Sequence, residues 1–297
     1  TYTLNDGTLL PGFNQETRVL GMNNSTGDLA GFVFGKQGYD LLGRRTGYNV
    51  AEQATDNNWL VQNANLNKQF AITHSENLSL KATLQPFKDL NINVNVLRNY
   101  SINESEFYRW NNISSAFESQ NNFKTAQLTY TTLTMPSAFQ KLDREYSSQT
   151  FQTLLNNRQT VSQFLGQQNA NSGLLPNQYF DGYSGSQQDV VIGAFLSAYT
   201  NTPVNDRNIN PVKNLPMPNW TINYNGLTKF EFTKKFLKNF KLNHGYSSTI
   251  AVSGMQTNLN SQLDVNGNST ARDINNNFIS ELQVQNVVVN EKFAPLV

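Results

Sequence analysis

The chain has 297 residues, of which 14% are charged, and its formal net charge is +1. This balance excludes the strongly basic surface that recruits nucleic acid, so we expect no nucleic-acid partner. Cysteine is absent, which excludes disulfides and thiolate metal sites, and no apolar run reaches the ~18 residues of a transmembrane helix. Asparagine fills 44 positions, so neutral amides supply much of the polarity.

Taken in chain order, the sequence predicts one all-β domain, 1–297, made of antiparallel strands that long polar loops connect. Short stretches in which apolar and polar residues alternate indicate the strands. The candidate strands are 59–72, 77–85, 90–102, 123–135, 189–200, 219–224, 240–252 and 279–290. One segment, 146–168, instead has apolar residues every three or four positions, which predicts a short amphipathic helix. Ser147 or Ser148 could cap its start.

Residues 77–102 show the alternation most clearly, as two strands around the turn Pro86-Phe87-Lys88-Asp89. Side chains alternate across a strand, so one face is apolar and the other polar. The apolar positions of this hairpin are Leu78, Leu80, Leu84, Leu90, Ile92, Val94 and Val96, and the polar positions that oppose the last four are Asn91, Asn93 and Asn95.

Two environments produce this pattern. A soluble sheet buries its apolar face on a core, whereas a transmembrane β-barrel turns that face to lipid and lines a wet lumen with polar residues. The 20 to 50 residues between several candidate strands favour the barrel, because outer-membrane barrels carry long extracellular loops. We therefore predict that the seven apolar residues face lipid and that the three asparagines face the lumen. Arg98 shares the lipid-facing side, and we expect it to reach the headgroups near the strand end.

Residues that could carry out chemistry are sparse. His74 and His244, the two histidines, stand far apart without metal-ligand spacing, so we expect both on strand surfaces. Glu104 and Glu106 are two positions apart in a predicted loop, and 264–273 resembles a calcium loop that lacks the closing glutamate. No nucleophile, phosphate-binding or dinucleotide motif occurs. We expect no enzyme, no catalytic residue, no cofactor and no metal.

Several short blocks resemble the SprA/Sov family, the giant outer-membrane translocon of the type IX secretion system in Bacteroidota, which is also tied to gliding motility. The blocks are LPGF at 10–13, FVFGKQ at 32–37, WL at 59–60, LN at 66–67, LQPFKDL at 84–90, QDV at 188–190, AFL at 194–196, the dense stretch 210–248 that contains PMPNWTINYNGLTKF and FLKNFKLNHGY, and VVNEKFAPL at 288–296. They span nearly the whole chain, although each is short.

This resemblance implies that the chain is a C-terminal-side portion of one very large barrel in the bacterial outer membrane. Such a barrel would pass folded cargo proteins through its lumen to the cell surface. The partners that the resemblance implies are the remainder of the same barrel chain, secreted cargo, a partner outer-membrane barrel, plug and periplasmic subunits that gate the channel, and membrane lipid.

Two alternatives stay open from the sequence. One is a substrate-specific porin or receptor barrel that closes by itself. The other is a soluble surface adhesin or carbohydrate-binding β-sandwich, in which Trp59, Trp110 and Trp220 could act as sugar platforms.

Overall fold

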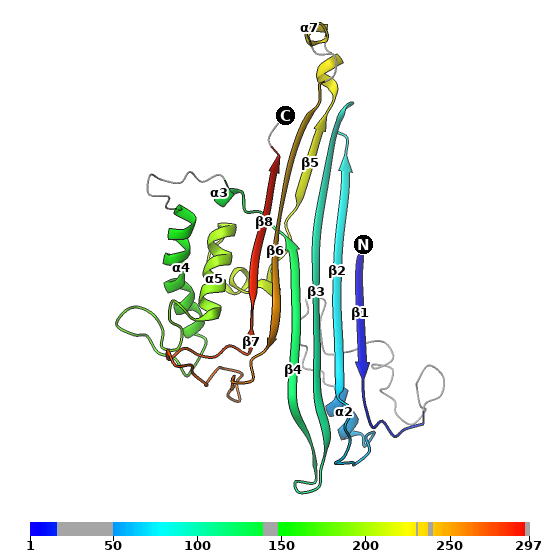
Figure 1. Cartoon of the computed structure of the whole chain (residues 1–297), viewed down its shortest axis with the longest axis vertical. Helices are drawn as coiled ribbons and strands as arrows, with labels where there is room; N and C mark the ends of the chain where they lie inside the picture. Colours follow the sequence, from blue (N-terminus) through cyan, green and yellow to red (C-terminus); the bar gives the residue numbers. More distant parts are fainter. Residues whose placement is uncertain (17–49, 139–147, 230, 237–239, 295–297) are drawn as a thin grey trace.

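The computed structural model describes residues 1–16, 50–138, 148–229, 231–236 and 240–294. It shows one antiparallel sheet with the two longest helices beside one of its edges (Figure 1). Two parts of the blocks that carry the family resemblance, 32–37 and 295–296, lie outside the described residues. The strands are β1 (Tyr2–Leu9), β2 (Phe70–Leu84), β3 (Leu90–Asn111), β4 (Ala116–Thr131), β5 (Asn219–Tyr224), β6 (Leu242–Thr257), β7 (Leu282–Gln283) and β8 (Asn286–Ala294). The helices are α2 (Val50–Asp56), α3 (Met135–Ala138), α4 (Gln149–Gly166), α5 (Gln188–Thr200), α6 (Asp206–Ile209) and α7 (Glu231–Lys234), with short 3-10 turns η2 (Pro211–Lys213) and η3 (Gly226–Lys229).

The sheet runs in the order β1-β2-β3-β4-β6, with β7 and β8 pairing along the far side of β6. β5 also pairs with both β3 and β6, so β4 and β5 occupy the same place in the sheet at different heights. Among the described strands, β1 and β8 form the two edges. The sheet formed by the described residues is therefore open.

The β2–β3 hairpin confirms the strongest sequence prediction. Leu84 pairs with Ile92 across the turn, and Asp89 takes a positive φ of 73° there. Both strands are longer than predicted, since β2 begins at Phe70 and β3 continues to Asn111. At about 3.4 Å per residue, the 22 residues of β3 extend over about 75 Å.

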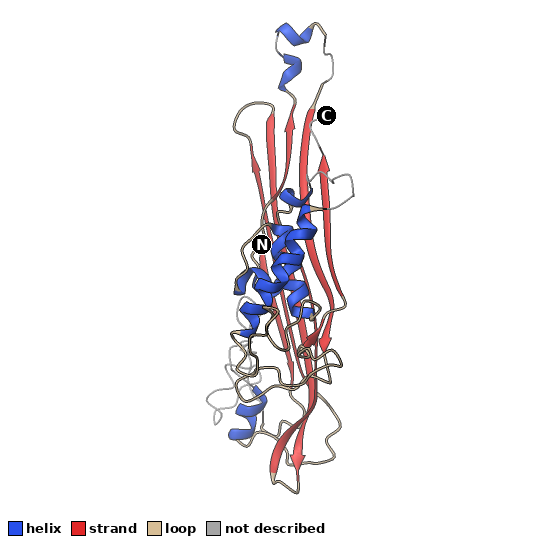
Figure 2. Cartoon of the chain, turned by 90° about the vertical axis from the view of Figure 1, so that its left-hand side faces the viewer, coloured by secondary structure: helices blue, strands red, loops and turns tan. Residues whose placement is uncertain are grey.

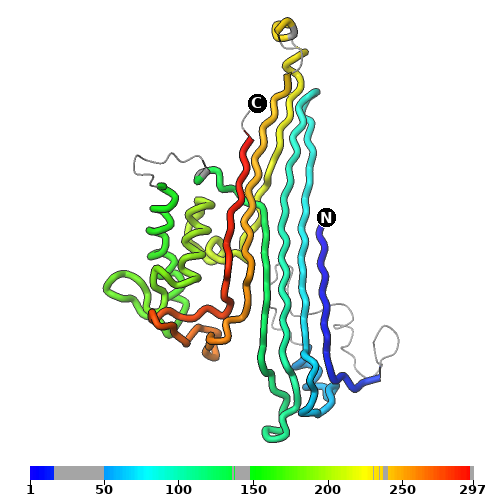
Figure 3. The backbone as a smooth tube through the Cα atoms, viewed as in Figure 1, coloured from blue at the N-terminus to red at the C-terminus, as the bar shows by residue number. Residues whose placement is uncertain are grey.

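Residues 132–218, here called the insert, leave the sheet between β4 and β5. Figure 3 shows the chain turning away at mid-height toward the helices. α4 confirms the predicted helix, and Ser148 caps it by accepting a hydrogen bond from the Phe151 N–H. α4 packs against α5, where Gly193 lets Val161 approach closely.

The predicted strand 189–200 is wrong, because these residues form α5. A continuous apolar run does not distinguish a buried helix from a buried strand. The Gln187 side chain accepts hydrogen bonds from the N–H groups of Asp189 and Val190, and Asn201 ends the helix in a left-handed conformation. Local capping and burial between α4 and the sheet therefore stabilise the helix.

Other strand boundaries also need correction. Residues 59–69 form a loop and not a strand, and an isolated β-bridge joins Leu60 to Phe13. The asparagines of this segment favour turns, as where the Asn63 side chain accepts a hydrogen bond from the Asn65 N–H. The predicted strand 123–135 corresponds to β4, which begins earlier, at Ala116, and ends at Thr131. The helix α3 begins four residues later, at Met135. β6 covers 242–257, and 279–290 contains β7 and only the start of β8. The prediction of 219–224 is confirmed as β5.

The insert packs on the same face as Tyr100 and Ile102 of β3. Together with these residues, Leu196 of α5 forms a buried cluster with Leu128, Tyr130, Ile250 and Val252 from β4 and β6. A second cluster lies within the insert and includes Leu154, Val161 and Val190. Figure 2, turned by 90° so that the left-hand side of Figure 1 faces the viewer, shows the helices of the insert in front of the strands. No helix among the described residues is both long enough and apolar enough to cross a bilayer.

Candidate functional site

The half of the sheet nearest the β2–β3 turn carries an apolar surface on the face that elsewhere supports the insert. Even-numbered residues of β3 share this face, so Val96 lies on the same side as the buried Tyr100. Register then aligns apolar residues across the strands, and His244 of β6 also lies on this face, opposite Ile222. We call this surface the apolar band, and it comprises Leu78, Leu80, Ala82, Leu84, Leu90, Ile92, Val94, Val96, Trp220, Ile222, Tyr224, Leu242, Tyr246 and Phe293.

Several side chains of the apolar band are exposed. Leu80 is 51% exposed and Leu84 is 53% exposed, whereas Ile92, Val94 and Val96 are half-buried by their neighbours in the sheet. None of these five belongs to a buried cluster formed by the described residues. The seven residues predicted to face lipid thus share one face of two adjacent strands, and their contact with lipid stays a prediction.

The opposite face, here called the open face, is rich in amides and hydroxyls. Asn93 and Asn95 are exposed there, Asn91 is half-buried, and the Thr83 hydroxyl donates a 2.8 Å hydrogen bond to the Asn93 side chain. The structure thus brings the three predicted lumen residues together on the side away from the insert. A hollow of about 260 Å³ further along this face is lined by Ser75, Asn77, Asn99, Ser101, Gln127 and Thr129.

A series of ionisable side chains lies at the border between the apolar band and the insert. The Asp6 carboxylate contacts His74 Nδ1 at 2.6 Å, His74 Nε2 contacts Glu76 at 3.1 Å, and Glu76 contacts Arg98 at 2.5 Å. Arg98 also donates a 3.0 Å hydrogen bond to the Val212 carbonyl. The series joins β1, β2 and β3 to the insert.

Two sequence expectations are corrected at this site. His74 is 2% exposed, so it is not on the strand surface, and its ring lies among the side chains of Asp6, Glu76 and Tyr100. Arg98 is 4% exposed and lies in the middle of β3, which continues for 13 residues beyond it, so it does not reach out from a strand end. Ionisable groups this deeply buried need close polar partners. The Glu76 carboxylate is such a partner for both His74 and Arg98.

Glu104 and Glu106 lie in β3 and not in a loop, and both side chains are buried. The Asn122 amide donates to Glu104 at 2.9 Å and to Glu106 at 3.2 Å, and the Ser119 hydroxyl also donates to Glu106. In the part of the chain that the structure describes, no group of three or more His, Cys, Asp and Glu residues could hold a metal ion.

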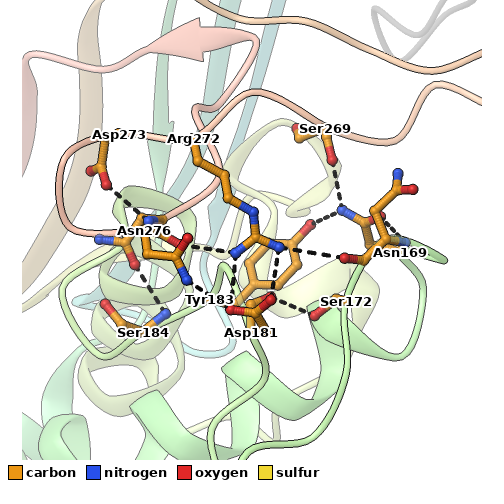
Figure 4. Close-up of polar contacts among 11 residues, drawn as sticks. Asn169, Ser172, Asp181, Tyr183, Ser184, Ser269, Arg272, Asp273 and Asn276 are labelled. Carbon is orange, nitrogen blue, oxygen red and sulfur yellow. Dashed lines mark hydrogen bonds and ion pairs between the residues drawn. The ribbon is translucent and has the colours of Figure 1, made fainter.

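A polar clamp holds the 258–281 connection against the insert (Figure 4). Arg272 donates two hydrogen bonds of 2.9 Å, one to each carboxylate oxygen of Asp181, and its guanidinium stacks 4.3 Å from the centre of the Phe278 ring. Asn276 adds a third bond to Asp181 at 2.9 Å. The hydrogen bonds from Arg272 outweigh partial desolvation and lower the pKa of Asp181 below its ordinary value.

The sequence did not predict this clamp, because its two halves are 91 positions apart. The residues of the suspected calcium loop are used otherwise. The Asp264 side chain accepts from the N–H groups of Asn266 and Asn268, as an Asx turn does.

The three tryptophans do not form a common platform. Trp59 is only 6% exposed and packs beside Phe13, whereas Trp220 stacks 4.9 Å from the Tyr246 ring in the apolar band. Trp110 lies at the opposite end of β3, against Phe117.

No protein-family model matches this chain, and no curated protein matches it. The likeness to the type IX translocon family, and the partners it implies, stay predictions.

Proposed function

We propose that the chain is a wall sector of a protein-conducting β-barrel in the bacterial outer membrane, of the kind that type IX secretion translocons form. The observation that carries this proposal is the sorting of side chains across five strands. Strand pairing aligns Ala82, Val94 and Trp220 in one row on the apolar band. The adjacent row, formed by Lys81, Asn95 and Asn219, lies on the open face.

The height of the apolar band fits a bilayer. From Leu90, which pairs with Tyr224, to Val96 the strand rises about 20 Å, which approaches the ~25 Å apolar belt of membrane barrels. Arg98 and its buried partners mark the end of the belt. Because β3 is about twice as long as a spanning strand of 9 to 11 residues, the half that supports the insert would extend beyond the membrane.

The open edges support a sector and not a complete barrel. Lipid does not tolerate unpaired backbone groups, so β1 and β8 would pair with the remaining strands of a longer barrel chain. In this arrangement the open face would form part of the lumen wall. Within the described strands, Lys81 and Lys292 are the charged residues on its membrane half. An amide surface with so few charges would let folded cargo pass without strong adhesion.

The barrel would act as a conduit whose partner subunits gate it, with energy supplied elsewhere. No step of this function requires a catalytic group. The connection to gliding motility comes from the sequence resemblance and is part of the same proposal.

The test compares two neighbouring residues of β3 in the full-length gene product. We expect Val94→Arg to cost about 2 to 4 kcal/mol of folding free energy in the membrane, because it sets a charge in the lipid belt. Asn93→Arg, one position away on the open face, should change assembly little. The measurements are the amount of protease-resistant protein in the outer-membrane fraction and the amount of cargo released to the cell surface.

Each outcome has a distinct meaning. Loss of assembly with Asn93→Arg and none with Val94→Arg would show that the two faces are inverted. If both variants assemble normally, the apolar band does not meet lipid. A closed, independent small barrel would favour the porin or receptor alternative, and a monodisperse protein without detergent would favour the adhesin.

A further inference from the structure

The connection between β5 and β6 forms a short tip beyond the β2–β3 turn. The tip comprises the described residues 226–229, 231–236 and 240–241 and contains η3 and α7. Figure 1 shows α7 past the ends of β2 and β3, at the end of the molecule that carries the apolar band. The Asn225 N–H donates to the Asp89 carbonyl at 2.9 Å, and Lys229 Nζ lies 2.5 Å from the Asp89 carboxylate. The tip is therefore joined to the turn that ends the band.

The chain enters the tip on the side of the sheet that bears the apolar band. Tyr224 belongs to the band, and Gly226 passes so close to it that a Cβ there would lie 2.4 Å from the Tyr224 hydroxyl. The exposed ring of Phe87 contacts the Tyr224 ring edge-on, with 6.0 Å between the ring centres. Aromatic side chains thus gather where the band ends, as they do at the borders of membrane barrels.

The tip exposes two further aromatic rings. Phe232 is 83% exposed and Phe236 is 80% exposed, and neither belongs to a buried cluster formed by the described residues. They are four positions apart in a connection that ends in lysines on both sides. Large apolar rings beside lysines are typical of segments that lie at the boundary between headgroups and acyl chains.

Positive charge is concentrated in the same segment. Residues 226–241 contain five lysines and one glutamate, a net charge of +4, whereas the whole chain carries +1. Lys229 is paired with Asp89, and Lys235 and Lys241 are exposed. Clustered lysines next to a membrane attract anionic headgroups.

We propose that the tip binds the surface of an anionic phospholipid leaflet, with Phe232 and Phe236 inserted at the acyl-chain boundary and the lysines on the headgroups. The inference rests on the proposed function for the position of the leaflet. It goes beyond that function because the tip lies outside the apolar band and its ligand is the headgroup layer. Since the rings and the lysines are both satisfied at one depth only, the tip would fix the height of the barrel wall in the bilayer.

The experiment places a fluorescent probe in the purified full-length gene product. The chain has no cysteine, so Phe232→Cys and, separately, Phe236→Cys each supply one labelling site once any cysteine elsewhere in the gene product is replaced by serine. Ile113→Cys is the control, because Ile113 is 96% exposed in the β3–β4 turn, at the opposite end of β3. The protein is reconstituted in phosphatidylcholine vesicles, or in an equal mixture with phosphatidylglycerol, and the lipids carry a quencher on the headgroup.

We expect both tip probes to be quenched, more strongly in the anionic vesicles, and the Ile113→Cys probe to be unaffected. Lys235→Gln and Lys241→Gln should each weaken binding of the tip to the anionic surface about fivefold, measured from the quenched fraction. Lys68→Gln, at an exposed position outside the tip, should change nothing. Unquenched tip probes would overturn the inference and leave a protein partner as the occupant. Equal quenching in the two kinds of vesicle, or equal quenching of the Ile113→Cys probe, would also overturn it.

A probe in the apolar band separates this inference from the proposed function. Leu80→Cys, tested with a quencher at the centre of the acyl chains, reports whether the band meets lipid. A quenched Leu80→Cys probe with unquenched tip probes would refute the inference and leave the proposed function standing. Quenched tip probes with an unquenched Leu80→Cys probe would show a protein that meets the membrane surface through its tip, and would refute the proposed function.

Discussion

The backbone N–H of Met217 donates a 2.8 Å hydrogen bond to the carbonyl of Thr131, the last residue of β4. The chain therefore returns to the sheet at the residue where it left it. Next to this point the Thr132 N–H donates to the Ser248 carbonyl at 3.0 Å, which extends the pairing of β4 with β6 by one residue. The two ends of the insert thus meet at one place, where β4 gives way to β5.

The first prediction concerns the start of the insert. Thr134 is fully buried, and its hydroxyl donates to Glu291 at 2.8 Å and lies 2.8 Å from the Ser248 hydroxyl. Thr134→Val keeps the shape of the side chain but removes its hydrogen bonds to Glu291 and Ser248. We expect the free energy of unfolding to fall by about 1 to 3 kcal/mol. Denaturant unfolding of the purified full-length protein measures the loss. Thr73→Val, at an exposed position, is the matched control, and an equal effect there would contradict the prediction.

The second prediction concerns the buried charges. Arg98→Met removes the partner of Glu76 and leaves a carboxylate buried beside His74, so we expect a loss of about 3 to 5 kcal/mol. Glu76→Gln in the same background removes that charge and should restore part of the loss. Unfolding free energies of the two single variants and the double variant give the coupling. Strictly additive effects would show that the two side chains act independently.

The third prediction concerns the contact between the insert and the 258–281 connection. Gly182 has a φ of +82°, and a Cβ there would overlap the ring of Phe278. Gly182→Ala should therefore destabilise the insert by about 1 to 3 kcal/mol, from backbone strain and overpacking. Gly173→Ala is a suitable control, since its Cβ would meet nothing within 4 Å. Limited proteolysis of the insert reports the difference, and equal cleavage of both variants would rule out the close packing.

The fourth prediction is a pH dependence of the clamp. Because Arg272 lowers the pKa of Asp181, the carboxylate contributes stability above its unfolded pKa, and this contribution is lost as the pH falls through the folded pKa. The pair is partly exposed, so we expect an effect of about 1 kcal/mol or less, confined to pH below about 4.

Amide hydrogen exchange within 258–281, normalised to that of the β3–β4 turn at each pH, measures this effect. Asp264 also has a lowered pKa, chiefly because it accepts the Asn268 N–H, so Asp181→Asn is needed to isolate the clamp. The wild-type protein should be better protected than Asp181→Asn near neutral pH, and the two should converge at low pH. A constant difference across the range would contradict the assignment.

The alternation of residues 77–102 by itself determined a hairpin, its turn and its two faces, because period two is a local property of a strand. The three- and four-residue spacing of 146–168 likewise determined α4. The run 189–200 carried no such period, since its surroundings on nearly all sides are apolar, and only the tertiary structure decided that it is a helix. Tertiary structure also decided that β4 and β5 share one place in the sheet and that Asp6, His74, Glu76 and Arg98 meet. Those contacts depend on pairing between strands that are distant in the sequence, and pairing register is set by the packed sheet as a whole and not by any one segment.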